Sequence, residues 1–326
     1  MEAALVERAN IPFKAIPAAG IHGVGLRSLP GNLWRLVRGV FAARRILREF
    51  KPDVLFFTGG YVAVPMALAG MRVPTALYVP DIEPGLALKT LARFADRIAV
   101  TAQDSFAYFK RPGRVTLTGY PTRPELGRWT RTEAHHALHL DANLPVLLVW
   151  GGSKGARSLN TAVLANLPAL LEMAQVVHVT GELDWTAVDA KARELNNPRY
   201  HPFPYLHTEE MGTALAAADL ALSRAGASTL GEYPLFGLPS ILVPYPYAWR
   251  YQKVNAESLV RSGAALLLED QPLAGQLLPE VKTLLADAPR LESMRQAAKA
   301  LSHPDAAAGI GSLLLALAGE RRSVNG

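Results

Sequence analysis

The sequence contains no cysteine, which excludes a disulfide scaffold, a zinc–thiolate centre and a thiol nucleophile. It also lacks an apolar run of the roughly 18 residues that a transmembrane helix needs. The best candidate, Val62–Met71, contains Pro65 and ends at Arg72. The first twenty residues carry acidic side chains where a signal peptide has a basic start and an apolar core. We therefore expect a cytoplasmic protein that touches a membrane only from the side.

Positive charge is concentrated at one end of the chain. The 326 residues include 34 Lys and Arg against 28 Asp and Glu, a formal net charge of +6. Residues 1–51 hold nine basic and three acidic side chains, so they account for the whole excess. Nucleic-acid-binding proteins usually spread basic residues along a whole face, so we expect no nucleic-acid partner but one local anionic partner. A composition of 50% hydrophobic and 19% charged residues excludes a disordered chain.

This basic segment has the pattern of an amphipathic helix. At about 100° per residue, one side gathers Leu33, Leu36, Val40, Ala43 and Leu47. The other side gathers Trp34, Arg38, Phe41, Arg45 and Arg48. Aromatic rings interleaved with arginines predict a helix that lies on an anionic membrane surface, with its rings at the headgroup boundary. The alternatives are that this side of the helix is exposed to solvent or that it forms a dimer contact.

Short apolar runs alternate with helical patterns from residue 53 onward, which is typical of βαβ units building parallel sheets. In the first half we expect strands at Phe13–Ile16, Val54–Thr58, Thr75–Val79, Arg97–Thr101 and Arg114–Thr118. In the second half we expect them at Val146–Trp150, Val176–Thr180, Tyr200–Phe203, Leu220–Ser223, Ser240–Val243 and Ala265–Leu268. The predicted class is α/β, with two Rossmann-like domains facing a cleft.

Residues 122–144 are rich in turns and poor in apolar periodicity, so we interpret them as the connection between the domains. The N-terminal domain then spans residues 1–121 and the C-terminal domain residues 145–326, whose last helix can return to the N-terminal domain. A doubly wound domain normally begins with a buried strand and a glycine-rich turn. Neither is present here, so we expect the first βα unit to be missing, either as a fragment or as an evolutionary loss.

Two glycine-rich turns in the second half are candidate phosphate sites. The first, Gly151–Gly155, follows a strand and precedes a helix, where free N–H groups favour an anion. Its spacing matches neither a Walker loop nor a dinucleotide fingerprint, so neither a kinase nor a dehydrogenase is supported. The second, SRAGASTLGE at 223–232, places Glu232 in the following helix, where a carboxylate can accept hydrogen bonds from ribose hydroxyls. Helix packing and an exposed glutamate are the structural alternatives.

Two loops of the first half also lie at predicted strand ends. Gly59, Gly60 and Tyr61 form a turn of the kind at which open α/β sheets bind ligands, although tight packing explains the glycines equally well. Asp81 and Glu83 follow the next strand. Either carboxylate can serve as a general base or hold sugar hydroxyls, or both can cap the helix that begins after Pro84.

The order of these motifs resembles the MurG family of UDP-N-acetylglucosamine transferases. The resemblance rests on GGY at 59–61, GYPTR at 119–123, GGSKGA at 151–156, SRAGASTLGE at 223–232, and Gln252 with Asn255 after VPYP. It covers residues 1 to about 320 and implies a GT-B fold, with UDP-GlcNAc as the donor substrate. It also implies that a lipid acceptor, undecaprenyl-pyrophosphoryl-muramoyl pentapeptide, approaches the N-terminal domain from the cytoplasmic face of the cell membrane during peptidoglycan synthesis.

The resemblance also implies residue roles for donor binding. Ser153 contacts the diphosphate or uridine, and Gly152 and Gly155 allow close approach. Arg123 lies near the donor, and Thr229 lies near the diphosphate. Glu232 binds the ribose hydroxyls, and Gln252 binds the GlcNAc hydroxyls. No metal or other cofactor is implied.

The sequence departs from the family pattern on the acceptor and sugar sides. The GGTGGH loop, whose histidine is the favoured base, is not present, and Tyr251 replaces the first of two glutamines. YVPDIEPG replaces HEQNG, and Tyr120 replaces an asparagine. Our first hypothesis is an inverting, metal-independent hexosyltransferase whose base is Asp81 or, less favoured, Glu83. The alternatives are a catalytically weak or inactive UDP-sugar-binding membrane protein and a transferase with another lipid acceptor.

Overall fold

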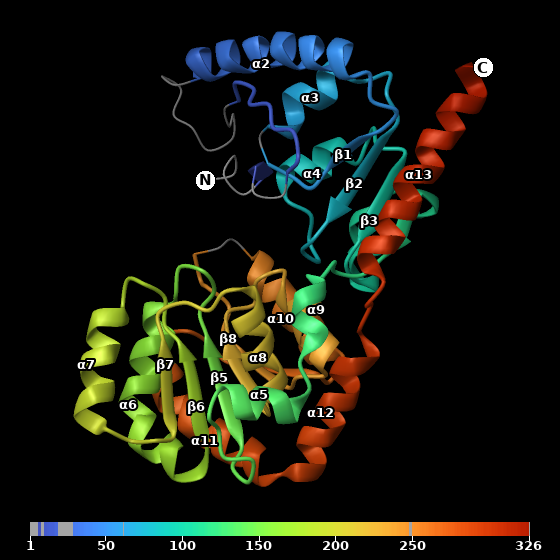
Figure 1. Cartoon of the computed structure of the whole chain (residues 1–326). Coiled ribbons are helices and arrows are strands. Elements are labelled where there is room, and N and C mark those ends of the chain that lie inside the picture. The colour runs from blue at the N-terminus through green and yellow to red at the C-terminus, as the bar shows by residue number, and fades with distance from the viewer. Residues whose placement is uncertain (1–5, 8–9, 19–28, 61, 248–249, 326) are drawn as a thin grey trace.

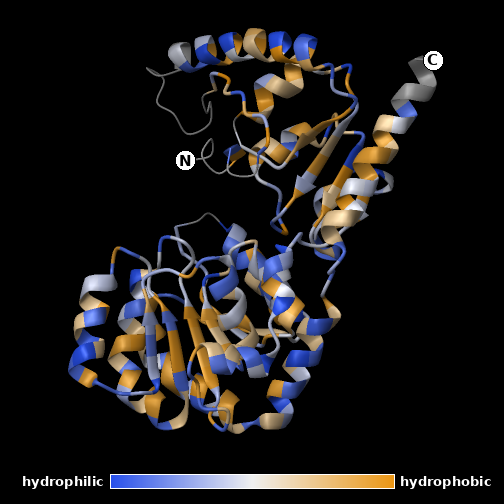
Figure 2. Cartoon of the chain, in the orientation of Figure 1, coloured by the Kyte–Doolittle hydropathy of each residue, from blue (hydrophilic) through white to orange (hydrophobic). Residues whose placement is uncertain are grey.

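The structure is a computed structural model that describes residues 6–7, 10–18, 29–60, 62–247 and 250–325. Two α/β domains each enclose a parallel sheet, and the last helix runs from the C-terminal domain along the N-terminal one (Figure 1). The strands of both domains are mostly apolar (Figure 2). This arrangement agrees with the predicted fold class.

The N-terminal sheet has the strand order β1-β2-β3-β4. Its strands are β1 (Leu55–Phe57), β2 (Thr75–Val79), β3 (Arg97–Val100) and β4 (Val115–Leu117). Its helices are α2 (Leu29–Phe50), α3 (Ala63–Ala69) and α4 (Leu86–Leu91), followed by the 3-10 turns η1 (Gln103–Tyr108) and η2 (Pro112–Arg114). All four strands lie within the predicted segments. β2 and β3 are almost fully buried, as expected for strands covered on both faces.

The predicted strand Phe13–Ile16 is wrong, because residues 11–18 have no regular secondary structure. Pro12 and Pro17 flank this segment and lack the N–H groups that a strand ladder requires. The segment lies against α2 instead. A Cβ at Gly39 would come within 2.2 Å of the Pro17 carbonyl oxygen, so the close approach requires glycine there.

The C-terminal sheet has the order β10-β9-β8-β5-β6-β7, which is the doubly wound pattern with its switch point between β5 and β8. Its strands are β5 (Val146–Trp150), β6 (Gln175–Val179), β7 (Tyr200–Phe203), β8 (Leu220–Ser223), β9 (Ser240–Leu242) and β10 (Ala265–Leu267). The helices before the sheet's last strand are η3 (Pro124–Arg128), α5 (Arg131–Ala137), α6 (Arg157–Met173), α7 (Trp185–Leu195), α8 (Thr208–Ala217), α9 (Thr229–Phe236) and α10 (Tyr251–Arg261). Those after it are α11 (Leu273–Ala286), α12 (Ala288–Ala300) and α13 (Ala306–Asn325).

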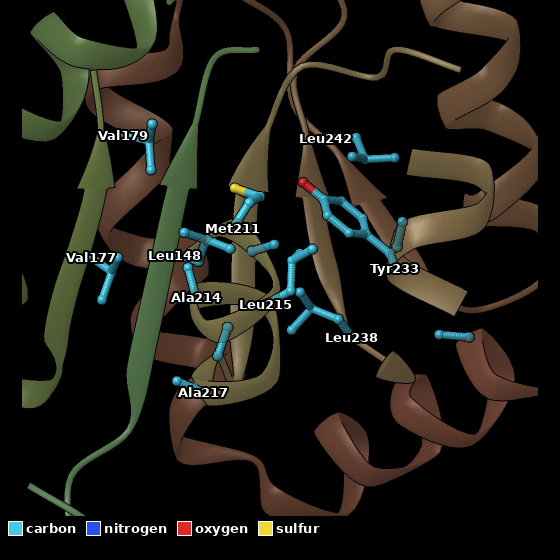
Figure 3. Packing of buried hydrophobic residues seen from close by; sticks show 14 of the residues in the cluster. Leu148, Val177, Val179, Met211, Ala214, Leu215, Ala217, Tyr233, Leu238 and Leu242 are labelled. Carbon is cyan, nitrogen blue, oxygen red and sulfur yellow. The ribbon is translucent and has the colours of Figure 1, made fainter. Parts of the chain in front are cut away.

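Each face of this sheet has its own core, because successive side chains of a strand point to opposite faces. In β5, Leu148 faces a cluster with Met211, Leu215 and Tyr233 from α8 and α9 (Figure 3). Leu147 faces the opposite cluster, which includes residues of α6 and α11. Burial on both faces fixes the register of β5 and thereby the position of the loop that follows it.

Helix α13 connects the two domains physically. Ile310 is buried against Tyr78 of β2 and Ala99 of β3, and Leu313 and Leu314 pack beside them. The chain therefore crosses to the C-terminal domain near residue 120 and returns through α13 (Figure 1). The packing of α13 and the contacts of α10 described below both hold the domains together.

Candidate active site between the domains

Two adjoining cavities lie at the carboxyl ends of β5 and β8. The larger has a volume of about 860 Å³ and is lined by residues 151–158 and by Asp270. The smaller has about 450 Å³ and is lined by residues 120–123 and by Glu232. Both share Gly151, Gly152, Ser153, Arg224 and Gln252. The pair therefore forms one site at the topological switch point, where doubly wound domains bind ligands.

The glycine-rich turn after β5 forms the floor of this site. Gly152 has a φ of +88°, and a Cβ there would meet nothing within 4 Å, so the backbone is bare toward the cavity. Gly155 has a φ of +74°, but a Cβ there would come within 2.2 Å of the Thr180 carbonyl oxygen. Gly152 therefore suits close approach of a ligand, whereas Gly155 is required by packing against the turn after β6.

Two helix N-termini face the cavities. Residues Ala156, Arg157 and Ser158 at the start of α6 line the larger one, and Ser228 and Thr229 at the start of α9 line the smaller one. Helix dipoles attract anions at such positions, although the Thr229 amide already donates to the Gly226 carbonyl. Two helix N-termini that converge on one site suit the binding of a diphosphate.

Glu232 lies in the first turn of α9 and is only 5% exposed, so it is not the exposed helix residue that the alternative assumed. Its Oε1 lies 3.9 Å from the Arg123 guanidinium, while its Oε2 has no hydrogen-bond partner among the described residues. Burial raises the pKa of Glu232 to about 7, against the opposing effects of Arg123 and Ser228. A buried, unpartnered carboxylate oxygen costs free energy until a ligand donates to it.

Other predicted donor residues are held by hydrogen bonds at the rim. Arg123 donates to the Thr208 hydroxyl at 2.7 Å. The Thr229 hydroxyl donates to the Gly226 carbonyl at 2.7 Å, which fixes the turn before α9. The Gln252 side-chain oxygen accepts from the Tyr245 amide at 2.8 Å. The structure thus brings Arg123, Ser153, Thr229, Glu232 and Gln252 together around one site.

Arg224 is a candidate site residue that the sequence analysis did not identify. It is 9% exposed and lines both cavities. Its guanidinium donates to Asp270 and to Ser158, each at 2.7 Å, and lies over the ring of Tyr245. The sequence does contain a signal for this residue, namely an arginine within the SRAGA turn. A charged side chain at the end of a buried strand needs a partner or a ligand.

The loop between β2 and α4 carries Asp81 and reaches into the C-terminal domain. Ile82 is 1% exposed and belongs to the core of that domain. Asn255 of α10 donates to Asp81 at 2.8 Å and accepts from the Ile82 amide at 3.0 Å. Burial raises the pKa of Asp81 despite the Asn255 hydrogen bond. Both Asp81 and Glu232 contribute, after burial, to the raised pKa of Tyr120, so Asp81 lies near the smaller cavity that Tyr120 lines.

Glu83 has a different environment from Asp81. It is 4% exposed and accepts from Arg250 at 2.5 Å and 3.0 Å and from Lys89 at 2.6 Å. The Arg250 hydrogen bond is the main cause that lowers the pKa of Glu83. A carboxylate stabilised by two cations is a weak base, so this geometry favours Asp81 over Glu83 for proton abstraction.

The acceptor-side turn is described only in part. Gly59 and Gly60 have φ angles of +123° and +83°, a backbone conformation that favours glycine, while Tyr61 lies outside the described residues. Tyr251, which stands where the family has a glutamine, has its hydroxyl 4.0 Å from where a Cβ on Gly85 would lie. It therefore points toward the N-terminal domain.

Helix α2 presents the predicted aromatic and basic face. Trp34 and Phe41 are each 64% exposed, and Arg38, Arg45 and Arg48 are exposed beside them. The opposite side packs on α3, with Ala43 fully buried (Figure 1). Leu33, expected on the packed side, is instead 56% exposed. Among the described residues no helix is long and apolar enough to span a membrane.

Comparison with solved structures defines the class of protein. The fold matches a crystal structure of Acinetobacter baumannii MurG with a TM-score of 0.76 and 26% identity, covering 97% of this chain and 88% of that one. It also matches CalG4, the calicheamicin glycosyltransferase, with a TM-score of 0.65 over 96% of this chain, at 17% identity. Two sheets of four and six parallel strands with a site between them are thus the GT-B fold of glycosyltransferases.

Sequence comparison identifies the family. Residues 1–100 match the glycosyltransferase family 28 N-terminal domain, and residues 146–310 match its C-terminal domain. The UDP-N-acetylglucosamine–N-acetylmuramyl-(pentapeptide) pyrophosphoryl-undecaprenol N-acetylglucosamine transferase of Roseiflexus sp. is 40% identical over 99% of this chain and 83% of its own length. The protein of the same name from Desulforudis audaxviator is 39% identical over 98% of this chain and 88% of its own. The chain therefore belongs to glycosyltransferase family 28.

Proposed function

We propose that this protein transfers N-acetylglucosamine from UDP-GlcNAc to undecaprenyl-pyrophosphoryl-muramoyl pentapeptide in peptidoglycan synthesis. Relatives about 40% identical over nearly the whole chain carry the name of this activity. The observation that carries the proposal is Glu232, a buried carboxylate with an unpartnered oxygen beside two converging helix N-termini. A nucleoside diphosphate supplies both the hydroxyl donors and the anion that such a site lacks.

The donor fits this site with its ends in a defined order. The ribose hydroxyls donate to Glu232, and the diphosphate lies over Gly152 and Ser153 at the starts of α6 and α9. The amide group of Gln252 is left to bind the sugar hydroxyls, because its oxygen is already held by Tyr245. The two cavities together are large enough for a nucleotide and a hexose.

Asp81 acts as the general base in this proposal. It removes the proton of the acceptor hydroxyl while that oxygen attacks the anomeric carbon, and the bond from that carbon to UDP breaks, with inversion. Its burial supports this role, because a raised pKa brings a carboxylate closer to the optimum for proton transfer near neutral pH. The helix N-termini and Arg123 stabilise the negative charge that develops on the departing UDP.

We further propose that the protein binds peripherally to the cytoplasmic face of the cell membrane through α2. Exposed Trp34 and Phe41 lie on the same face as Arg38, Arg45 and Arg48. Large exposed aromatic side chains are costly without a partner, and clustered arginines attract anionic lipid. Such a contact holds the protein on the membrane that contains its lipid acceptor.

Acceptor-dependent release of UDP tests the proposed reaction. UDP-GlcNAc is incubated with the full chain and the lipid-linked muramoyl pentapeptide in detergent, and released UDP is measured with a coupled assay. We expect turnover that requires the acceptor. Release no faster than in the blank without acceptor would contradict the transferase and favour a sugar-nucleotide-binding protein. Release with a different polyprenyl acceptor alone would change the substrate but keep the reaction class.

A further inference from the structure

A further cavity, rich in positive charge, lies wholly within the N-terminal domain. It has a volume of about 400 Å³ and lies between α4, β3 and the segment that contains η1 and η2. It shares no lining residue with the two cavities of the donor site. Five of its nine lining residues are basic, namely Lys89, Arg93, Lys110, Arg111 and Arg114, and none is acidic.

Most of this charge is not neutralised by the protein. Lys89 pairs with Glu83, and Arg114 donates to the Ala95 carbonyl, which carries no charge. For the side chains of Arg93, Lys110 and Arg111, the described part of the chain contains neither a hydrogen-bond nor an ion-pair partner. Four of the five cations therefore face one small space without an anion.

The acidic side chains closest in sequence are committed elsewhere. Asp96 accepts from the Thr75 amide at 2.8 Å, and Asp104 pairs with Arg261 of α10 at 2.6 Å. No local rearrangement of these two carboxylates supplies the missing charge without breaking a contact that orders β2 or joins the domains. A bound anion supplies this charge without breaking either contact.

The walls of the cavity define the chemistry of that anion. Arginine guanidinium groups bind phosphate oxygens through paired N–H donors, and several cations around one cavity suit a group with two or more charges. Tyr108 and Phe109 form an apolar side of the cavity, and Lys89 lies 5.7 Å above the Tyr108 ring. An apolar wall reduces screening by water and strengthens each charge interaction.

We propose that this cavity is a binding site for a phosphate-bearing group with at least two negative charges. Free diphosphate and the phosphomonoester headgroup of phosphatidic acid share this chemistry. The site is separate from the donor site, so it does not depend on the identity of the sugar nucleotide. Its position beside Lys89 and Glu83 places a bound anion next to the ion pair that reaches Arg250 of the C-terminal domain.

The test measures binding of inorganic pyrophosphate to the full chain by calorimetry, with the donor site saturated with UDP. We expect pyrophosphate still to bind, and the Lys110→Gln/Arg111→Gln variant to bind at least about tenfold more weakly. The matched control, Arg72→Gln/Lys282→Gln, removes the same charge from exposed positions elsewhere and should bind like the unmodified protein. Unchanged UDP affinity in both variants verifies that they are folded.

A second arm distinguishes a lipid-borne phosphate from a free one. Co-sedimentation with vesicles that contain phosphatidic acid is measured for the same three proteins, all of which keep α2 intact. Weaker vesicle binding by the Lys110→Gln/Arg111→Gln variant alone, without pyrophosphate binding, assigns the site to a lipid headgroup. If neither pyrophosphate binding nor vesicle binding differs between the Lys110→Gln/Arg111→Gln variant and the control variant, the proposal is wrong.

Discussion

Glu232 gives the donor site a pH dependence that can be measured. Burial raises its pKa to about 7, so it takes up a proton below that pH and loses the charge that the ribose hydroxyls need. We expect UDP affinity to fall by up to about tenfold per pH unit below about pH 7. Titration calorimetry between about pH 5.5 and pH 8 measures this.

The matched variant is Glu232→Gln, which keeps the shape of the side chain but does not titrate. At the upper pH its UDP affinity should be about 10- to 100-fold lower, because a charge-assisted hydrogen bond is lost. Its remaining pH dependence then reports only the titration of UDP itself. Parallel pH profiles for the variant and the unmodified protein would show that Glu232 does not bind the ribose.

Asp81 is the residue on which the proposed chemistry depends. Asp81→Asn removes the base but keeps a side chain that can face Asn255, so we expect turnover to fall about 100-fold or more while UDP binding is unchanged. The raised pKa of Asp81 also predicts that activity decreases on the acidic side, because the protonated carboxyl cannot accept a proton. A variant that retains most of its rate would remove this assignment.

At the level of elements, α2 separates membrane attachment from catalysis. Trp34→Ala with Arg38→Glu replaces one exposed ring and reverses one charge on the face opposite α3. We expect binding to anionic vesicles to weaken about tenfold or more, since each basic residue contributes on the order of 1 kcal/mol at such a surface. Co-sedimentation with vesicles of different anionic content measures the effect.

The control for α2 is Leu315→Ala with Lys282→Glu, which changes an exposed leucine and an exposed lysine of the C-terminal half in the same way. It should bind vesicles like the unmodified protein. Activity with a detergent-solubilised acceptor should be unchanged in both variants. Vesicle binding that is insensitive to anionic lipid, or unaffected by the α2 substitutions, would refute the membrane face.

Helix α10 is the element that joins the C-terminal domain to the loop carrying Asp81 and Glu83. Glu83→Gln removes the carboxylate that accepts from Arg250 and Lys89, and we expect the thermal midpoint to fall by a few degrees at neutral pH. The pKa of Glu83 is lowered in the folded protein, so its stabilisation is present above the ordinary value of 4.5 and is lost as the pH falls through the lowered value.

Differential scanning calorimetry at neutral and acidic pH tests this prediction. The difference between Glu83→Gln and the unmodified protein should shrink as the pH falls below 4.5. Glu172→Gln, at an exposed position of α6, serves as the control and should leave the midpoint unchanged at both pH values. If the thermal midpoint of Glu83→Gln lies below that of the unmodified protein by the same amount at every pH, the loss of stability comes from packing and not from charge.

At the scale of the whole molecule, the sequence predicts most of the fold because buried parallel strands are short, apolar and β-branched. β2, β5, β7 and β8 begin and end at the predicted residues, and the remaining strands of the described sheets differ by one residue at one or both ends. The error at Phe13–Ile16 has a physical origin. The segment contacts α2 through the Pro17 carbonyl at Gly39 and through the Lys14–Glu49 ion pair, and hydrophobic pattern alone does not distinguish such a segment from a strand.

The candidate site is less predictable, because it depends on contacts between residues far apart in the sequence. The strand-end rule places Ser153 and Glu232 on one sheet edge. It does not reveal that Arg224 bridges Ser158 and Asp270, or that Glu83 is bound by Arg250 across the domain boundary. Such pairings follow from how the two domains dock, which local pattern does not encode.

Transfer of labelled N-acetylglucosamine tests the central claim most directly. UDP-GlcNAc with a radiolabelled sugar is incubated with the full chain and lipid-linked muramoyl pentapeptide, and the label recovered in the lipid fraction is compared with the UDP formed. We predict that label enters the lipid fraction in equimolar amount with UDP and that Asp81→Asn strongly reduces both. UDP binding without any label in the lipid fraction would contradict the account.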